Sequence, residues 1–158
     1  KIFFEYGEEK FSRLIAKNII KAREDYRIDT TFKLKDIVTK SIKSNEAHPE
    51  KRVFQALRIE VNRELDVLKD TIDKVVDHLN KDGRLAIITF HSLEDRIVKN
   101  KFKDLATDCI CPPEFPVCVC NHKAKVKIIT RKPITASKKE LEENSRAKPA
   151  KLRVCQRI

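Results

Sequence analysis

The sequence has 158 residues, of which 41% are hydrophobic and 37% charged, enough for one domain of ordinary size or for parts of two. No apolar run is long enough to span a membrane and the first residues do not resemble a signal peptide, so we expect a cytoplasmic chain without a membrane partner. The 35 Lys and Arg residues outnumber the 24 Asp and Glu residues, and the net charge of +11 favours a polyanionic partner, nucleic acid, over a merely basic, soluble surface.

Apolar residues at helical spacing run through the first half of the chain. They predict a helix over 8–25 and then a second amphipathic helix, for which Thr30 and Thr31 offer an N-cap. A turn region over 44–49 follows. Over 53–79 the apolar residues recur at steps of three and four, which indicates one very long helix or two consecutive ones.

The apolar run 85–90 follows a single glycine, Gly83. It predicts a fully buried strand of the kind found in parallel sheets that are covered on both faces. His91 and Ser92 come at the carboxyl end of this strand, just before a predicted helix, and open α/β sheets bind their ligands at that edge. We therefore interpret His91 and Ser92 as candidate catalytic residues on the substrate side of a cleft.

Each of these polar residues also has a structural interpretation. Ser92 is favoured as the helix N-cap, with Asp95 where a capping box would carry Glu or Gln. His91 would then be a partly buried residue that anchors the end of the strand. Asp95 and Arg96 are interpreted as a structural ion pair and helix-terminal polar groups rather than as catalysts.

Strands and a short helix are predicted near the end of the chain. The strands cover 126–130 and 152–155, and Ser137 caps a helix over 138–143. Cys155, in the last strand, is interpreted as a small core residue.

Four cysteines lie within an irregular, proline-containing segment after the predicted helix: Cys109, Cys111, Cys118 and Cys120. Four thiolates this close in sequence can surround a tetrahedral zinc ion. However, Cys-x-Cys is a poorer chelating pair than Cys-x2-Cys, and alternate residues of an extended run point apart. Free thiols in a surface loop are therefore favoured, with zinc as the alternative.

Glycine is scarce, since Gly7 and Gly83 are the two glycines of the chain, where about ten would be ordinary. Loops that bring the backbone close to a phosphate or a nucleotide need glycine, because a Cβ would block the approach. The sequence therefore contains no dinucleotide-type binding turn.

Basic residues of the first helix, Lys17, Lys21 and Arg23, are candidate phosphate contacts. The alternative for each of them is ordinary solvated surface.

Several blocks of the sequence resemble one protein family, in the same order along the chain: Tyr6–Phe11, His48-Pro49 together with Phe54–Asn62, Phe90–Lys99, Thr130–Ile134 and Ala150–Val154. The most specific of them are Phe-Gln-Ala-Leu-Arg-Ile, from Phe54, and Phe-His-Ser-Leu-Glu-Asp-Arg, from Phe90. The chain resembles the carboxyl-terminal portion of the bacterial small-subunit ribosomal RNA methyltransferases of the MraW (RsmH) family.

The resemblance implies an α/β fold, in which a helical insert over 1–67, associated with RNA recognition, precedes the late part of a Rossmann-like class I methyltransferase sheet over 68–158. The N-terminal strands of that sheet are missing. It also implies methylation of the N4 of a cytidine by S-adenosylmethionine, with small-subunit ribosomal RNA or the assembling small subunit as partner and a homodimer left open. The family's cofactor motifs belong upstream, so no cofactor-binding residue is carried over and we expect the isolated chain to be inactive.

The family match also raises further residues of the predicted long helix as RNA contacts, namely Arg52, Gln55, Arg58 and Asn62. A structural network within the protein is the competing interpretation. For the chain as a whole, the alternative function is a non-catalytic, basic RNA-binding or ribosome-assembly module.

Overall fold

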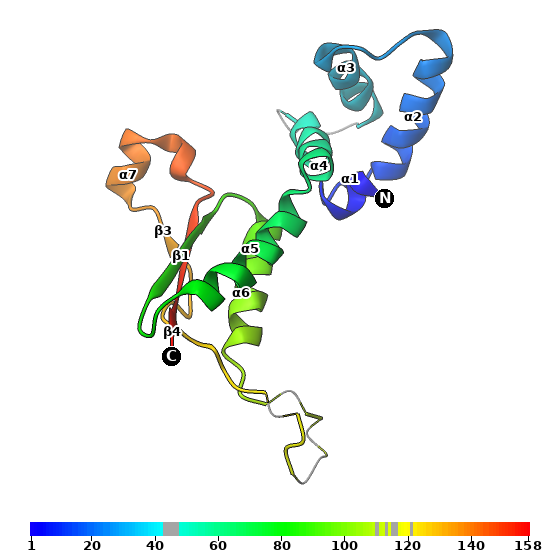
Figure 1. Ribbon diagram of the computed structural model, residues 1–158. Helices are drawn as coiled ribbons and strands as arrows, with labels where there is room; N and C mark the ends of the chain where they lie inside the picture. The colour runs from blue at the N-terminus through cyan, green and yellow to red at the C-terminus, as the bar shows by residue number, and fades with distance from the viewer. Residues whose placement is uncertain (43–47, 110, 113, 115–116, 121) are drawn as a thin grey trace. The chain divides into compact units, whose positions relative to one another are not determined.

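The computed structural model describes residues 1–42, 48–109, 111–112, 114, 117–120 and 122–158 (Figure 1). It forms two compact units, Lys1–Glu64 and Leu65–Ile158. Most of the predicted turn over 44–49 lies outside the described residues.

The first unit is helical and consists of α1 (Ile2–Glu5), α2 (Ser12–Asp25), α3 (Thr31–Ser41) and α4 (Glu50–Asn62). Its core is a cluster of aliphatic side chains: Ile15, Val38, Ile42 and Val53. Thr30 caps α3 as predicted, because its side chain accepts a hydrogen bond from the Lys33 N–H at 3.3 Å.

The first predicted helix begins later than its apolar pattern indicates, at Ser12 rather than at residue 8. Glu8 has a left-handed backbone with φ of 49°, which cannot continue a helix. The buried carboxylate of Glu9 accepts a hydrogen bond from the Phe11 N–H at 2.8 Å and so holds this turn. The predicted boundary was wrong because a buried Glu in a turn leaves no periodic signal.

The long apolar repeat forms two consecutive helices, α4 and α5 (Glu64–His78). They are separated at Arg63, which takes a left-handed conformation with φ of 52°. The side chain of Glu64 accepts hydrogen bonds from Arg58 and Asn62, so polar contacts gather at this break.

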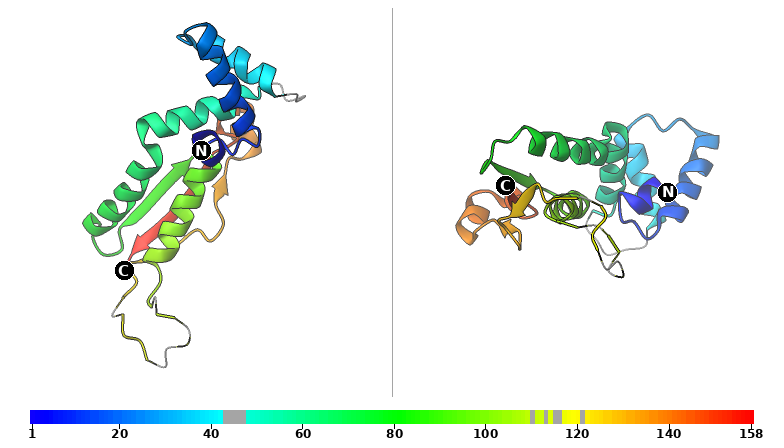
Figure 2. Two further views of the ribbon diagram at one scale, coloured as in Figure 1. Left: turned by 90° about the vertical axis from the view of Figure 1, so that its right-hand side faces the viewer. Right: turned by 60° about the horizontal axis from the view of Figure 1, so that its bottom comes forward.

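The second unit combines α5 with an antiparallel sheet and further helices. After α5 come β1 (Arg84–Thr89), α6 (Ser92–Leu105), β2 (Val126–Ile128), β3 (Ile134–Thr135), α7 (Lys138–Glu143), a 3-10 turn over Ser145–Ala147 and β4 (Lys151–Arg157). The strand order is β1-β4-β2, with β3 also paired to β4, and each described pairing is antiparallel. The last strand therefore lies between β1 and β2, beside α6 (Figure 2).

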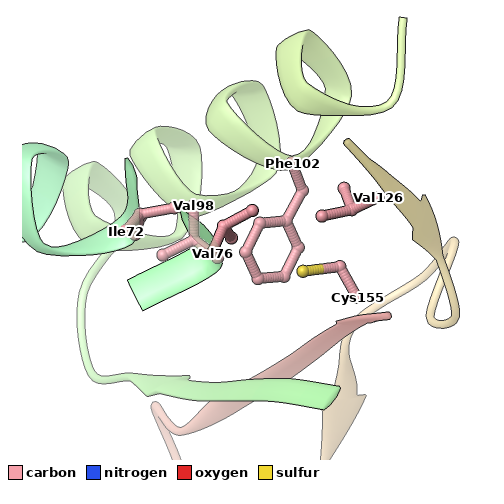
Figure 3. Close-up of a cluster of buried hydrophobic side chains, with 6 residues drawn as sticks. All are labelled: Ile72, Val76, Val98, Phe102, Val126 and Cys155. Atoms are coloured by element: carbon pink, nitrogen blue, oxygen red, sulfur yellow. The ribbon is translucent and has the colours of Figure 1, made fainter. Parts of the chain in front are cut away.

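The core of this unit lies between the two long helices and one face of the sheet (Figure 3). Phe102 of α6 occupies its centre, against Val126 and Cys155 of the strands. Cys155 is fully buried, which confirms its interpretation as a core residue, and burial raises the pKa of its thiol to about 11.

The expectation of a fully buried parallel strand was wrong for β1. It pairs antiparallel with β4, and burial alternates along it, so that Leu85 and Ile87 pack on the core while Ile88 is 58% exposed. The reason is that side chains of α5 and α6 pack on one face of the sheet, whereas Ile88 points to the other face and stays exposed within the described residues of the second unit.

The remaining predicted elements differ mainly in length. β2 ends at Ile128 rather than at residue 130, and β4 is longer than predicted. The two-residue β3 after Pro133 had no signal in the sequence. The helix α7 matches its prediction, and the Ser137 side chain accepts a hydrogen bond from the Glu140 N–H at 3.2 Å.

Candidate functional site

His91 follows the end of β1 by two residues and is the N-cap residue of α6. Its Nδ1 accepts a hydrogen bond from the Glu94 N–H at 3.4 Å, and the Glu94 Oε2 accepts bonds from the N–H groups of His91 at 3.2 Å and Phe90 at 2.7 Å. These reciprocal bonds form a capping box, with His91 in the place usually held by Ser or Thr. The predicted cap at Ser92 with Asp95 was wrong by one residue, since Ser92 is the exposed first residue of the helix.

The other ring nitrogen of His91 faces a different environment. Because Nδ1 accepts a hydrogen bond, Nε2 carries the proton of the neutral ring. This Nε2 is buried and has no hydrogen-bond partner among the described residues; it lies 3.3 Å from the Glu94 Oε1 without the alignment of a hydrogen bond. The strand end therefore presents a buried, unsatisfied N–H donor.

Asp95 forms an ion pair with the last strand rather than with Arg96. Its Oδ1 accepts a hydrogen bond from the Arg153 Nε at 2.6 Å, and its Oδ2 lies 3.4 Å from the Lys151 Nζ. The Arg153 hydrogen bond, followed by the charges of Arg153 and Lys151, holds the pKa of Asp95 below its usual value although burial opposes this. Asp95 thus takes part in a structural ion pair as predicted, but the predicted partner was wrong, because Arg153 lies 58 residues away and no local pattern indicates it.

The predicted basic face of α2 divides into two parts. Lys17 and Lys21 are exposed and four residues apart, so they lie on one side of the helix. Arg23 is also exposed but lies about 200° around the helix from Lys21, at about 100° per residue. Within the described residues these three side chains have no ion-pair or hydrogen-bond partner.

The other RNA-contact candidates are held by bonds within the first unit. Arg52 lies 3.5 Å from the buried Glu9 Oε2, and the Gln55 Nε2 donates to the Tyr6 carbonyl at 3.2 Å. Arg58 donates two hydrogen bonds to Glu64, at 2.8 and 3.0 Å, and Asn62 donates one at 3.1 Å. A structural network is thus present, although Arg52 and Arg58 keep exposed side chains.

A groove of about 450 Å³ lies between α3 and α4. Two aromatic rings, Phe32 and Phe54, line this groove. Its other lining residues are three cationic, two neutral polar and one acidic: Lys35, Lys51, Arg58, Thr31, Gln55 and Glu50. Phe32 is 76% exposed, which is unusual for an aromatic ring. Phe32 was not among the residues predicted from the sequence. It could have been recognised as an aromatic residue that lies outside the row of apolar residues on its helix.

The four cysteines of the segment between α6 and β2 come together. The Cys118 Sγ lies 3.4 Å from the Cys109 Sγ and 3.5 Å from the Cys120 Sγ, and the Cys109 and Cys120 sulfurs are 3.8 Å apart. The Cys111 Sγ completes a group whose four sulfurs lie within 4.8 Å of one another. The backbone N–H of Cys111 lowers the pKa of Cys109, but hydrogen bonds with the neighbouring thiols and desolvation outweigh it and raise that pKa to about 12.

Comparison with known proteins identifies the class. The profile of the MraW methylase family matches residues 1–158. "Ribosomal RNA small subunit methyltransferase H" of Clostridium botulinum (strain Loch Maree / Type A3) is 58% identical over 161 residues, covering 100% of this chain and 52% of that protein. The protein of the same name from Lachnospira eligens is 54% identical over 162 residues, covering 100% of this chain and 51% of that protein.

The relatives of this mixed α/β chain are named as methyltransferases. The chain belongs to the MraW methylase family. It spans about half the length of the curated relatives that it matches. Among the described residues, no helix is both long and apolar enough to cross a membrane.

Proposed function

We propose that this chain provides the RNA-recognition helices and the late part of a Rossmann-like class I sheet to an enzyme that methylates small-subunit ribosomal RNA. The methyl acceptor is the N4 of a cytidine and the donor is S-adenosylmethionine. The observation that carries this proposal is the similarity to proteins named for ribosomal RNA small subunit methylation, which extends over the whole chain.

The second unit supports its assignment as part of a larger sheet. An apolar row crosses the uncovered face, where Ile88 pairs with Leu152 and Leu152 in turn pairs with Ile134. An exposed apolar face of this kind is unfavourable in water, at roughly 25 cal/mol per Å². We infer that further residues of the complete protein cover it.

Side chains of the first unit have the chemistry that single-stranded RNA recognition requires. Exposed aromatic rings such as Phe32 can stack on unpaired bases, while cations such as Lys35 and Arg58 contact phosphates. Lys17 and Lys21 add charge without partners of their own among the described residues. The intramolecular bonds of Arg58 and Gln55 fix two of the lining side chains in place, which lowers the entropy cost of binding.

His91 is proposed as a substrate-side residue. Its buried Nε2–H can donate to an acceptor on the base or ribose, since no described residue accepts a hydrogen bond from it. In the larger Rossmann-like sheet proposed above, the carboxyl end of β1 would lie at the edge where open α/β sheets bind ligands. Ser92 is exposed beside it and extends the same edge. Both residues position the base, and positioning supplies much of the acceleration in group transfer.

The two glycines of the chain, both within the described residues, do not fit a cofactor-binding turn. A Cβ added to Gly7 would lie 2.6 Å from the Phe3 carbonyl oxygen, and one added to Gly83 would lie 2.9 Å from the Asn80 carbonyl oxygen. Both glycines are thus required by close contacts within the chain, and neither is free to approach a ligand. The same observation favours the second candidate function, a basic RNA-binding module without catalysis.

A chimaera tests the proposal. This chain would replace the matching half of the Clostridium botulinum relative, and small ribosomal subunits lacking the modification would be the substrate. We expect N4-methylcytidine in nuclease digests analysed by mass spectrometry, with the unaltered relative as positive control. A folded chimaera that binds the subunit but transfers no methyl group would support the non-catalytic module instead.

A further inference from the structure

In the segment that joins α6 to β2, residues 107–124, the described side chains form no hydrophobic core. At its base the Lys125 N–H donates to the Leu105 carbonyl at 2.8 Å, and the Ala124 N–H donates to the Asp108 carboxylate at 3.2 Å. None of its described residues is buried. A loop of this length without buried apolar side chains needs another source of order, since conformational entropy opposes a fixed structure.

The arrangement of the four cysteine sulfur atoms suggests what orders this loop. The two cysteines that follow α6 and the two that precede β2 meet at one point. Their four sulfurs lie within 4.8 Å of one another, and three of the sulfur pairs are 3.4, 3.5 and 3.8 Å apart. Zinc–sulfur bonds of about 2.3 Å place the sulfurs of a regular tetrahedron about 3.8 Å apart. The four sulfurs thus have nearly the spacing that one tetrahedral metal ion requires.

Two disulfides explain this arrangement less well. Sulfurs joined in a disulfide are about 2.05 Å apart, and a disulfide selects one partner for each sulfur. Here Cys118 is nearly equidistant from Cys109 and Cys120, so no pairing is selected. In addition, the Val119 N–H donates to the Cys111 Sγ at 3.4 Å, and a backbone donor of this kind stabilises the negative charge of a metal-bound thiolate.

We propose that Cys109, Cys111, Cys118 and Cys120 bind one zinc ion as a structural site. Each thiol releases its proton to solvent as the metal binds, so four thiolates and Zn²⁺ form a centre with a net charge of −2. All four coordination positions are filled by the protein, which leaves no open position for water and assigns the metal to folding rather than catalysis. The ion would fix the loop and hold Val117 and Val119, which are 69% and 67% exposed, at the protein surface.

Metal analysis of the purified full chain tests this site. We expect elemental mass spectrometry to find close to one zinc ion per chain. Co²⁺ added to the metal-free chain should give the intense visible absorption of a tetrahedral thiolate site. Cys118→Ser should lose most of the zinc and this absorption. Val117→Ser, which introduces the same side chain at the adjacent exposed position, should retain both.

A second measurement separates metal binding from a folding defect. Because the loop lies outside the core formed by α5, α6 and the sheet, Cys118→Ser should speed amide hydrogen exchange in 107–124 while exchange in β4 is unchanged. Removal of zinc with a chelator should have the same effect on the unsubstituted chain. Chains without zinc, zinc retained by Cys118→Ser, or two disulfides in the protein purified under reducing conditions would each overturn the proposal.

Discussion

The first turn of α6 is capped by a histidine, His91. Statistical preferences for N-caps favour Ser, Thr, Asp and Asn, so the sequence directs attention to Ser92. The structure instead gives the cap to His91, because its Nδ1 can accept from the Glu94 N–H while Glu94 returns two bonds to the backbone. One residue therefore has two assignments, helix cap through Nδ1 and proposed substrate contact through Nε2.

Two substitutions separate these assignments. His91→Ala removes the cap and should lower the free energy of unfolding by about 1 kcal/mol, whereas His91→Asn keeps a capping oxygen and should cost little. Both lack Nε2, so both should slow methyl transfer by the chimaera if this nitrogen contacts the substrate. Urea unfolding and single-turnover rates measure the two effects, and an unchanged rate in His91→Asn would limit His91 to capping.

Asp95 should make the chain sensitive to acid. The pKa of Asp95 in the folded chain lies below its ordinary value of 3.8, so the charged carboxylate favours folding. This contribution is fully present above that ordinary value and is lost as the pH falls through the lower folded pKa. Asp95→Asn leaves the buried Arg153 without its counter-charge and should cost about 3 kcal/mol at neutral pH.

Denaturant unfolding at several pH values measures this effect, and the difference between the two proteins should shrink as the pH falls below 3.8. Asp77→Asn is the matched control, because Asp77 pairs with Lys125 at a half-exposed position where ion pairs contribute little. A constant difference across the acid range would show that the charge of Asp95 is not the source of its effect.

At the level of helices and strands, apolar periodicity predicted the existence of most elements and local chemistry predicted some of their starts. Thr30 and Ser137 cap their helices as expected, because a hydroxyl three residues before a backbone N–H is a local feature of the sequence. Two consecutive helices were one of the two alternatives for 53–79, but the position of the break at Arg63 was not predicted, and neither was the turn at Glu8. Both residues have a left-handed backbone, which leaves no signal in the apolar pattern. The four clustered cysteines were visible in the sequence as a possible zinc site, but only the chain path shows that their sulfurs meet.

The face of α2 carries a prediction about RNA. Lys17 and Lys21 share one side of the helix, so replacing both with Gln in the chimaera should weaken RNA binding and reduce the slope of log affinity against log salt by roughly one to two. Arg23→Gln, on another side, should change the slope less. Filter binding at several salt concentrations measures this. Equal slopes for all three proteins would assign Lys17 and Lys21 to ordinary solvated surface.

Over the whole molecule, both glycines are committed to internal contacts. Gly7 packs against the Phe3 and Arg52 carbonyl oxygens in the first unit, and Gly83 packs against the Asn80 carbonyl oxygen in the second. Neither has a positive φ, the conformation for which a phosphate-binding turn commonly uses glycine. The scarcity of glycine was visible in the sequence, whereas the use of each glycine required the fold.

The chain alone should therefore bind S-adenosylmethionine weakly or not at all, although it belongs to a methyltransferase family. A cofactor of this size is usually held by a concave site with backbone groups close to it, and the chain offers no glycine for such an approach. Isothermal titration of the purified chain should give no heat at micromolar cofactor, whereas the chimaera with the upstream half of the Clostridium botulinum relative should bind it. Circular dichroism of the chain provides the control for folding. Micromolar binding by the folded chain would place a cofactor pocket on these residues and would overturn the assignment of that pocket to the other half of the protein.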